Sequence, residues 1–181
     1  MKVKAESIKL VLPSEEYLDQ VWAYRQECLD ANGHMDGCGP LRQVESAEQW
    51  LAEVRSYTDP ATLPEGKVLA TQFLAVRESD GKVVAMIQIR HYFNEYLEKY
   101  AGHIGYSTRP SERRRGYAKE QLRLSLPYCK ELGLGRVLIS CEPDNPGSRR
   151  TILANGGVYE STVHEPGADI DLERYWITIR G

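Results

Sequence analysis

The sequence has few cysteines and no pair of the CxxC type. Cys28, Cys38, Cys129 and Cys141 are the only cysteines among its 181 residues, and they are scattered. Such spacing indicates neither a zinc site nor a disulfide framework, so a reducing cytoplasm fits best. No apolar run is long enough for a signal peptide or a bilayer span, and we expect no membrane partner.

The common phosphate-binding loops are also missing. No GKS or GKT occurs and nothing matches GxGxxG, which disfavours nucleotide binding by those routes. A formal net charge of -3 and a pI near 5.9 argue against a nucleic-acid partner, because nucleic-acid-binding surfaces are usually strongly basic. With no repeat, low-complexity tract or linker, residues 1–181 are expected to form a single domain.

One short segment could suggest a metal site. Residues 31–39 read ANGHMDGCG, which combines turn-forming residues with His34, Asp36 and Cys38. A fourth ligand is missing and the spacing matches no known pattern, so we expect a loop and no metal.

Strand and helix patterns alternate along the chain, which predicts a mixed α/β fold. Asp80-Gly81 between two apolar runs indicates an antiparallel hairpin. Ser46 with Gln49 predicts a capping box, and Asn145-Pro146 predicts a helix cap followed by proline at the first helical position. Strands are expected at 8–12, 68–76, 83–89, 104–108, 136–141, 158–163 and 175–179, and helices at 14–28, 46–54, 118–132 and 145–155.

Three consecutive arginines, Arg113 to Arg115, precede Gly116 between an expected strand and an expected helix. Taken alone, such a run is a solvated basic turn. In this setting the free N–H groups of the first helical turn and the positive end of the helix dipole make an anion site. Gly116 lets a ligand approach the backbone, and small Ala118 keeps the next turn open.

These residues carry a family resemblance. Arg113-x-x-Gly116-x-Ala118 fits the Q/R-x-x-G-x-G/A coenzyme A signature of the GNAT acyltransferases, and the chain resembles this superfamily best over 81–163. The motifs GHIGY and ERRRGYA are similar to those of a bacterial subgroup of acetyltransferases. The resemblance implies a GNAT fold: a central twisted, mostly antiparallel sheet with one splayed pair of parallel strands, and helices on both faces.

The resemblance also implies acetyl-coenzyme A as cosubstrate, bound in the cleft between the splayed strands. Its pantetheine would pair with the strand that holds Tyr106 and Thr108, and its pyrophosphate would lie on the backbone after that strand. Asn145 and Ser148 would line the pantetheine side. The implied cofactor-binding residues are Tyr106, Thr108, Arg113, Arg114, Arg115, Gly116, Tyr117, Ala118, Asn145 and Ser148.

The catalytic groups are less clearly indicated. In many members of the family a tyrosine seven residues after the asparagine acts as the general acid that protonates the departing thiolate. This chain has Ile152 at that position. Glu142 and His103 are the candidates for a general base, because each is expected near the cleft. The alternative for Glu142 is a solvated carboxylate in a loop, and the alternative for His103 is a histidine that only satisfies a hydrogen bond in the core.

Three further residues near the expected cleft have open roles. Arg90 and His91 could bind a substrate carboxylate, although Arg90 could equally be a surface ion-pair partner, and His91 could also act as a base. Cys141 ends an apolar run, which favours a buried, inert thiol.

The sequence thus predicts an acetyl-coenzyme A dependent N-acetyltransferase. Its acceptor would be a small amine or amino-acid-like molecule with a primary amine, attacked directly in a ternary complex. Ile152 motivates an alternative, a module that binds or senses acyl-coenzyme A without turnover, and an unrelated anion-binding domain is a third option. Exposed edge strands near the C-terminus leave room for a homodimer.

Overall fold

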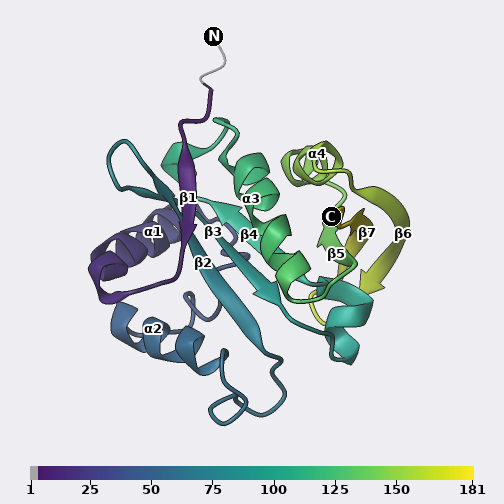
Figure 1. Ribbon diagram of the computed structural model, residues 1–181, viewed down its shortest axis with the longest axis horizontal. Coiled ribbons are helices and arrows are strands. Elements are labelled where there is room, and N and C mark those ends of the chain that lie inside the picture. The colour runs from purple at the N-terminus through teal and green to yellow at the C-terminus, as the bar shows by residue number, and fades with distance from the viewer. Residues whose placement is uncertain (1–3) are drawn as a thin grey trace.

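The computed structural model describes residues 4–181 and places the strands in two antiparallel sheets (Figure 1). The first has the order β1 (Ile8–Val11), β2 (Ala70–Arg77), β3 (Val83–Arg90) and β4 (Ile104–Thr108). The second has the order β5 (Arg136–Cys141), β7 (Ile170–Thr178) and β6 (Val158–Glu165). The sequence predicted each strand, but β7 begins earlier than expected and the single sheet is divided between β4 and β5.

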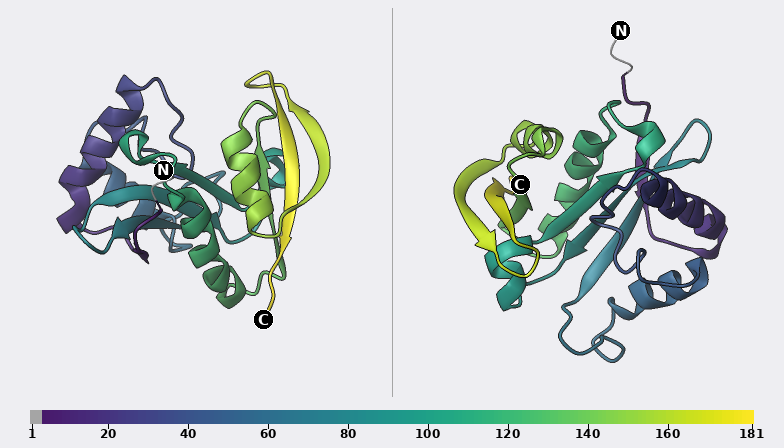
Figure 2. Two further views of the ribbon diagram at one scale, coloured as in Figure 1. Left: turned by 90° about the horizontal axis from the view of Figure 1, so that it is seen from above. Right: turned by 180° about the vertical axis from the view of Figure 1, so that it is seen from behind.

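The helices cover both faces of the first sheet, as Figures 1 and 2 show. Helices α1 (Leu18–Asp30) and α2 (Ala47–Ser56) lie on one face, and α3 (Tyr117–Glu131) lies on the other. Helix α4 (Pro146–Ala154) packs beside α3 and β5. A π-helical turn at Leu97–Ala101 was not anticipated. Within residues 4–181 no helix is both long and apolar enough to cross a membrane.

Local hydrogen bonds explain where two helices begin. The Ser46 hydroxyl accepts a hydrogen bond from the Gln49 N–H at 3.1 Å, and the Gln49 side chain accepts one from the Glu45 N–H at 2.9 Å. The Asn145 side chain accepts from the Ser148 N–H at 3.1 Å. Both predicted caps are therefore confirmed, and they satisfy N–H groups that a helix leaves unpaired.

Side chains on the two faces of the first sheet contribute to two different hydrophobic cores. Leu74 and Met86 pack with α1 and α2, whereas Ile87 and Ile89 pack with α3 and with the second sheet. All four are fully buried. Each such side chain stabilises the fold by about 2 kcal/mol through the hydrophobic effect.

The two sheets meet at one end of β4. The His103 N–H donates to the Leu138 carbonyl at 2.8 Å, and the Leu138 N–H donates to His103 Nδ1 at 2.9 Å. Gly102 approaches even more closely, because a Cβ built there would lie 2.3 Å from the Leu138 oxygen. Gly102 and Ile139 form an isolated antiparallel bridge at this junction, and beyond it β4 and β5 diverge, since the residues that follow on both strands line one cleft.

Replacement of Gly102 by alanine tests how tight the junction is. Gly102→Ala should lower the free energy of unfolding by about 3 kcal/mol, because the new methyl group would clash with backbone and the residue has a φ of +71°. Gly81→Ala is the matched control, since Gly81 has the same φ of +71° with nothing within 4 Å, and should lose only about 1 kcal/mol. Urea unfolding measures both, and equal losses would contradict a crowded junction.

The buried imidazole at the junction should make stability depend on pH. Burial, aided by the nearby Arg90 charge, lowers the pKa of His103 from 6.5 to about 4. As pH falls from 6.5 to 4 the unfolded chain therefore takes up a proton that the folded chain refuses, and up to about 3 kcal/mol of stability is lost.

The variant His103→Asn isolates this contribution. Its amide oxygen can still accept the Leu138 N–H, but it does not titrate. The variant should therefore lose less stability than the wild type between pH 6.5 and pH 4. Urea unfolding at several pH values gives the difference, and parallel pH profiles would show that His103 is not held neutral.

Candidate active site

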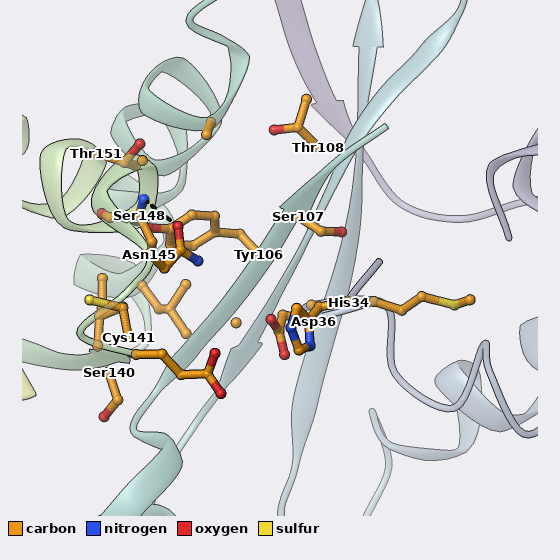
Figure 3. Close-up of a pocket in the computed structure, with 18 of the residues that line it drawn as sticks. His34, Asp36, Tyr106, Ser107, Thr108, Ser140, Cys141, Asn145, Ser148 and Thr151 are labelled. Atoms are coloured by element: carbon orange, nitrogen blue, oxygen red, sulfur yellow. Dashed lines mark hydrogen bonds between the residues drawn. The ribbon is translucent and has the colours of Figure 1, made fainter. Parts of the chain in front are cut away.

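A large cleft separates β4 from β5 and has a volume of about 1990 Å³. Its walls come from both strands, from the starts of α3 and α4, from the loop after α1 and from the turn between β6 and β7. Ligand pockets commonly measure about 300–1,000 Å³, so this cleft has room for a long cosubstrate and a second molecule. Figure 3 shows side chains from β4 and from the β5–α4 segment that line it.

The backbone before α3 forms a concave set of N–H groups at the mouth of the cleft. Arg114 has a φ of 64° and Gly116 a φ of 88°, and such left-handed residues turn successive N–H groups toward one point. Among the described residues, the N–H groups of Arg114, Arg115 and Gly116 have no acceptor; the Glu120 N–H is the first to bond back, to Gly116 O at 3.1 Å. This geometry suits a phosphate anion.

Glycine at position 116 is needed for its conformation. A Cβ there would lie 3.5 Å from the Ala5 Cβ, an ordinary contact, so no atom of residues 4–181 crowds the site. Residues with a Cβ disfavour the left-handed φ, so glycine is the residue that allows this backbone conformation and the orientation of its N–H groups.

The three arginines have separate surroundings. Arg115 lies 3.2 Å from the Glu112 carboxylate. Arg113 extends toward the loop after α1, where its Nη2 would be 3.2 Å from a Cβ on Gly33. Arg114 is exposed and forms no ion pair within the described part of the chain. The run is therefore not one uniform positive patch.

Glu112 supports the backbone segment before α3, a role that the sequence did not indicate. Its side chain is buried, and it accepts hydrogen bonds from Arg77 at 2.9 Å and from Lys82 at 2.8 Å. Burial raises the pKa of Glu112, but the bonds from Lys82 and Arg77 outweigh it and hold the pKa below its usual value. The carboxylate therefore stays charged and ties the β2–β3 hairpin to the start of α3.

Tyr106 and Ser148 approach each other across the cleft. The Tyr106 hydroxyl lies 2.7 Å from Ser148 Oγ, and Figure 3 shows both beside Asn145. Burial raises the pKa of Tyr106 well above its usual value, so the hydroxyl stays protonated. Tyr106 and Thr108 also belong to the unpaired edge of β4, because β4 is the last strand of its sheet. The structure thus brings together the strand and helix residues that the family resemblance implies.

The candidate bases are not all near the cleft. Glu142 follows β5 directly and lines it. His103 does not line it, since its ring bonds to Leu138 and stacks on Phe93 with centroids 4.0 Å apart. The structure thus does not bring the predicted general base His103 into the cleft, and the histidine joins the sheets instead.

His91 is also absent from the cleft walls. Its Nε2 lies 2.8 Å from the Thr71 hydroxyl, which in turn bonds to the Tyr128 hydroxyl at 2.7 Å. The structure therefore does not bring His91, a predicted substrate-binding residue, into the cleft. Arg90, in contrast, does line the cleft.

Ile152 and Cys141 have side chains that are unsuited to acid catalysis and to nucleophilic attack, respectively. Ile152 is fully buried in the core beneath α4, so nothing acidic occupies the position where many relatives have tyrosine. Cys141 lines the cleft, but burial raises the pKa of its thiol to about 11. The thiol is therefore protonated near neutral pH and is a poor nucleophile.

The loop after α1 forms part of the cleft wall, which the sequence pattern did not reveal. His34 and Asp36 face the cleft from the side opposite Cys141 and Asn145 (Figure 3). Gly37 holds the loop in place, because a Cβ there would lie 2.3 Å from Gly105 O. The only signal in the sequence was the coincidence of polar residues with glycines in one turn-rich segment.

Comparisons with known proteins identify the family of this chain. The sequence model of the acetyltransferase (GNAT) domain family matches residues 8–158. A search of curated proteins finds no match.

Solved structures with a similar fold extend over nearly the whole chain. A GNAT-family acetyltransferase from Bacillus anthracis has a TM-score of 0.67 at 22% identity and covers 98% of both chains. RimL, a ribosomal L7/L12 α-N-protein acetyltransferase in complex with coenzyme A, has a TM-score of 0.71 at 17% identity, covering 98% of this chain and 97% of its own. Mycobacterium smegmatis RimJ in complex with CoA-disulfide has a TM-score of 0.69 at 20% identity, covering 98% and 84%.

The family match spans most of the chain, and the solved structures share its fold throughout. The chain is an acetyltransferase of the GNAT family, whose members take the acetyl group from acetyl-coenzyme A.

Proposed function

We propose that the protein transfers an acetyl group from acetyl-coenzyme A directly to the primary amine of a small acceptor, with both molecules in the cleft at once. The observation that carries this proposal is the set of unpaired N–H groups from Arg114 to Gly116, at the mouth of a cleft large enough for both. Acetyl-coenzyme A supplies the acetyl group as a thioester.

The backbone from Arg114 to Ala118 would form a cradle that holds the pyrophosphate, and we refer to this segment as the cradle. Its N–H groups converge, and the positive end of the α3 dipole adds to their attraction for an anion. The side chains of Arg113 and Arg114 are available for further charge-assisted contacts, whereas the Arg115 side chain already forms an ion pair with Glu112. Tyr117 is buried at the first helical position and contributes its N–H group only.

The pantetheine arm would lie along the free edge of β4, where the backbone of Tyr106 and Thr108 can pair with its amides. Ser148 and Asn145 form the opposite wall. The Asn145 side-chain oxygen already caps α4, so its amide N–H group is the part left for a ligand.

The amine must lose a proton to attack the thioester. Glu142 is the carboxylate at the end of β5 that lines the cleft, and we assign it the role of general base, directly or through one water. Cys141 remains a thiol, which favours direct attack over an acyl-enzyme. Ile152 has no proton to give, so the departing thiolate would be protonated by water in the open cleft.

Coenzyme A binding can be tested at position 116. Gly116→Val should weaken acetyl-coenzyme A binding about tenfold or more, because a β-branched residue cannot hold the left-handed φ of 88° that aligns the N–H groups. Gly133→Val is the matched control at the other end of α3, with a φ of 81° and nothing within 4 Å. Titration calorimetry should show normal affinity for the control; normal affinity in both variants, or none in the wild type, would contradict the cradle.

The role of Glu142 predicts a separate effect on turnover. Glu142→Gln should lower kcat about 100-fold while the KM for acetyl-coenzyme A stays unchanged, because only proton removal is lost. Asp144→Asn removes the same charge from an exposed residue two positions away and should leave kcat unaltered. Thiol release with the most reactive amine of a panel measures both, and equal rates would rule out Glu142 as the base.

A further inference from the structure

Arg90 is a charged side chain in the cleft that forms no ion pair with any residue of the range 4–181. It ends β3, and its Nη1 donates only two long hydrogen bonds, to Gly102 O at 3.3 Å and to Ala101 O at 3.5 Å. Within residues 4–181 no carboxylate oxygen comes within 4 Å of its guanidinium. A largely desolvated charge of this kind is costly unless an anion pairs with it.

The unused side of this guanidinium is directed at the cleft wall. A Cβ built on Gly105 would lie 3.4 Å from Arg90 Nη2, and Gly105 itself lines the cleft. Nη2 has no hydrogen-bond acceptor among the described residues. The lack of a side chain at Gly105 therefore leaves one edge of the guanidinium open to a ligand.

This position is far from the phosphate-binding backbone. Arg90 and Ala85 are the two ends of a stretch of β3, and Ala85 pairs with Thr108, the last residue of β4 before the cradle. Five residues of strand cover about 17 Å. The guanidinium and the cradle thus lie at opposite ends of the cleft, and an anion at Arg90 would belong to the acceptor.

A carboxylate stands near Arg90 on the loop after α1. Asp36 is exposed and lines the cleft, and no cation lies within 4 Å of it in the described part of the chain. Two contacts fix its neighbour Gly37: close packing on Gly105, and a 2.6 Å hydrogen bond from the buried Gln72 side chain to Gly37 O. Asp36 is therefore held beside β4.

The electric field of Asp36 reaches both walls of the cleft. Burial lowers the pKa of Arg90, and the Asp36 charge partly opposes this shift. The same charge adds to the rise in the pKa of Tyr106. Asp36 thus faces the space between the guanidinium and the side chain across which the pantetheine would lie.

We propose that the acceptor is a free amino acid or a close analogue, whose carboxylate binds Arg90 while its amino group is oriented by Asp36 toward the thioester. This inference rests on the proposed function and narrows it. A guanidinium matches a carboxylate by two parallel hydrogen bonds. A polyamine would leave Arg90 unpaired and bring a second positive charge to it, and the N-terminus of a protein has no carboxylate next to its amine.

The decisive experiment compares pairs of acceptors that differ only in the carboxylate. Thiol release from acetyl-coenzyme A is measured for the common free amino acids, for the amide of each, for spermidine and for a peptide with a free N-terminus. At least one free amino acid should be acetylated with a kcat/KM about 100-fold above that of its amide, because the amide leaves Arg90 unpaired. Equal rates for acid and amide, or reaction only with spermidine or the peptide, would overturn the inference.

A variant then assigns the discrimination to Arg90. Arg90→Gln should lose about 100-fold in kcat/KM for the free amino acid and treat acid and amide within about threefold of each other. Arg123→Gln, which removes an exposed arginine of α3, should keep the wild-type preference. A preference that survives in Arg90→Gln would show that another group binds the carboxylate.

Calorimetry with acetyl-coenzyme A separates this inference from the proposed function. Arg90→Gln should bind the cosubstrate with wild-type affinity, since Arg90 lies away from the cradle. If the wild type does not bind acetyl-coenzyme A, the proposed function fails. If it binds but acetylates no free amino acid, only the inference about the acceptor fails. Should the variant not fold, the comparison of acids with amides in the wild type still decides.

Discussion

The pair of hydrogen bonds between His103 and Leu138 is the constraint on which the site depends. Together with the bridge between Gly102 and Ile139 it joins the two sheets at one end of β4, and the close approach of Gly102 prevents them from spreading there. Because the strands are joined at one end only, they diverge at the other and open a cleft. The same junction leaves the edge of β4 unpaired, which is the edge that a cosubstrate can use.

Two charged side chains, the buried Glu112 and the partly buried Arg90, differ in whether the protein itself pairs them. Glu112 meets Arg77, Lys82 and Arg115 inside the protein, so the cost of burying it is offset and it stabilises the start of α3. Arg90 has lost much of its water as well, yet the described residues offer it only backbone carbonyls. A paired charge supports the cradle, and an unpaired one at the far end of the cleft is suited to a ligand.

Local patterns predicted much of the fold and one half of the site. The caps at Ser46 and Asn145 and the strand-turn-helix around Gly116 are confirmed, because each depends on neighbouring residues in the chain. The positions of His91 and His103 could not be predicted in this way, because they depend on distant residues. Whether His103 faces a cleft or a neighbouring strand depends on Leu138, which lies 35 residues away in sequence.

The sequence by itself determined the elements and the signature at the start of α3, because helix caps, turns and left-handed glycines act over a few residues. Only the tertiary structure decided which side chains share the cleft. Asp36 from the loop after α1 and Arg90 at the end of β3 both line the cleft. His91 and His103 lie outside it, because each bonds to a residue elsewhere in the fold. Such neighbours are brought together by packing across the sheets, which leaves no periodic trace in the chain.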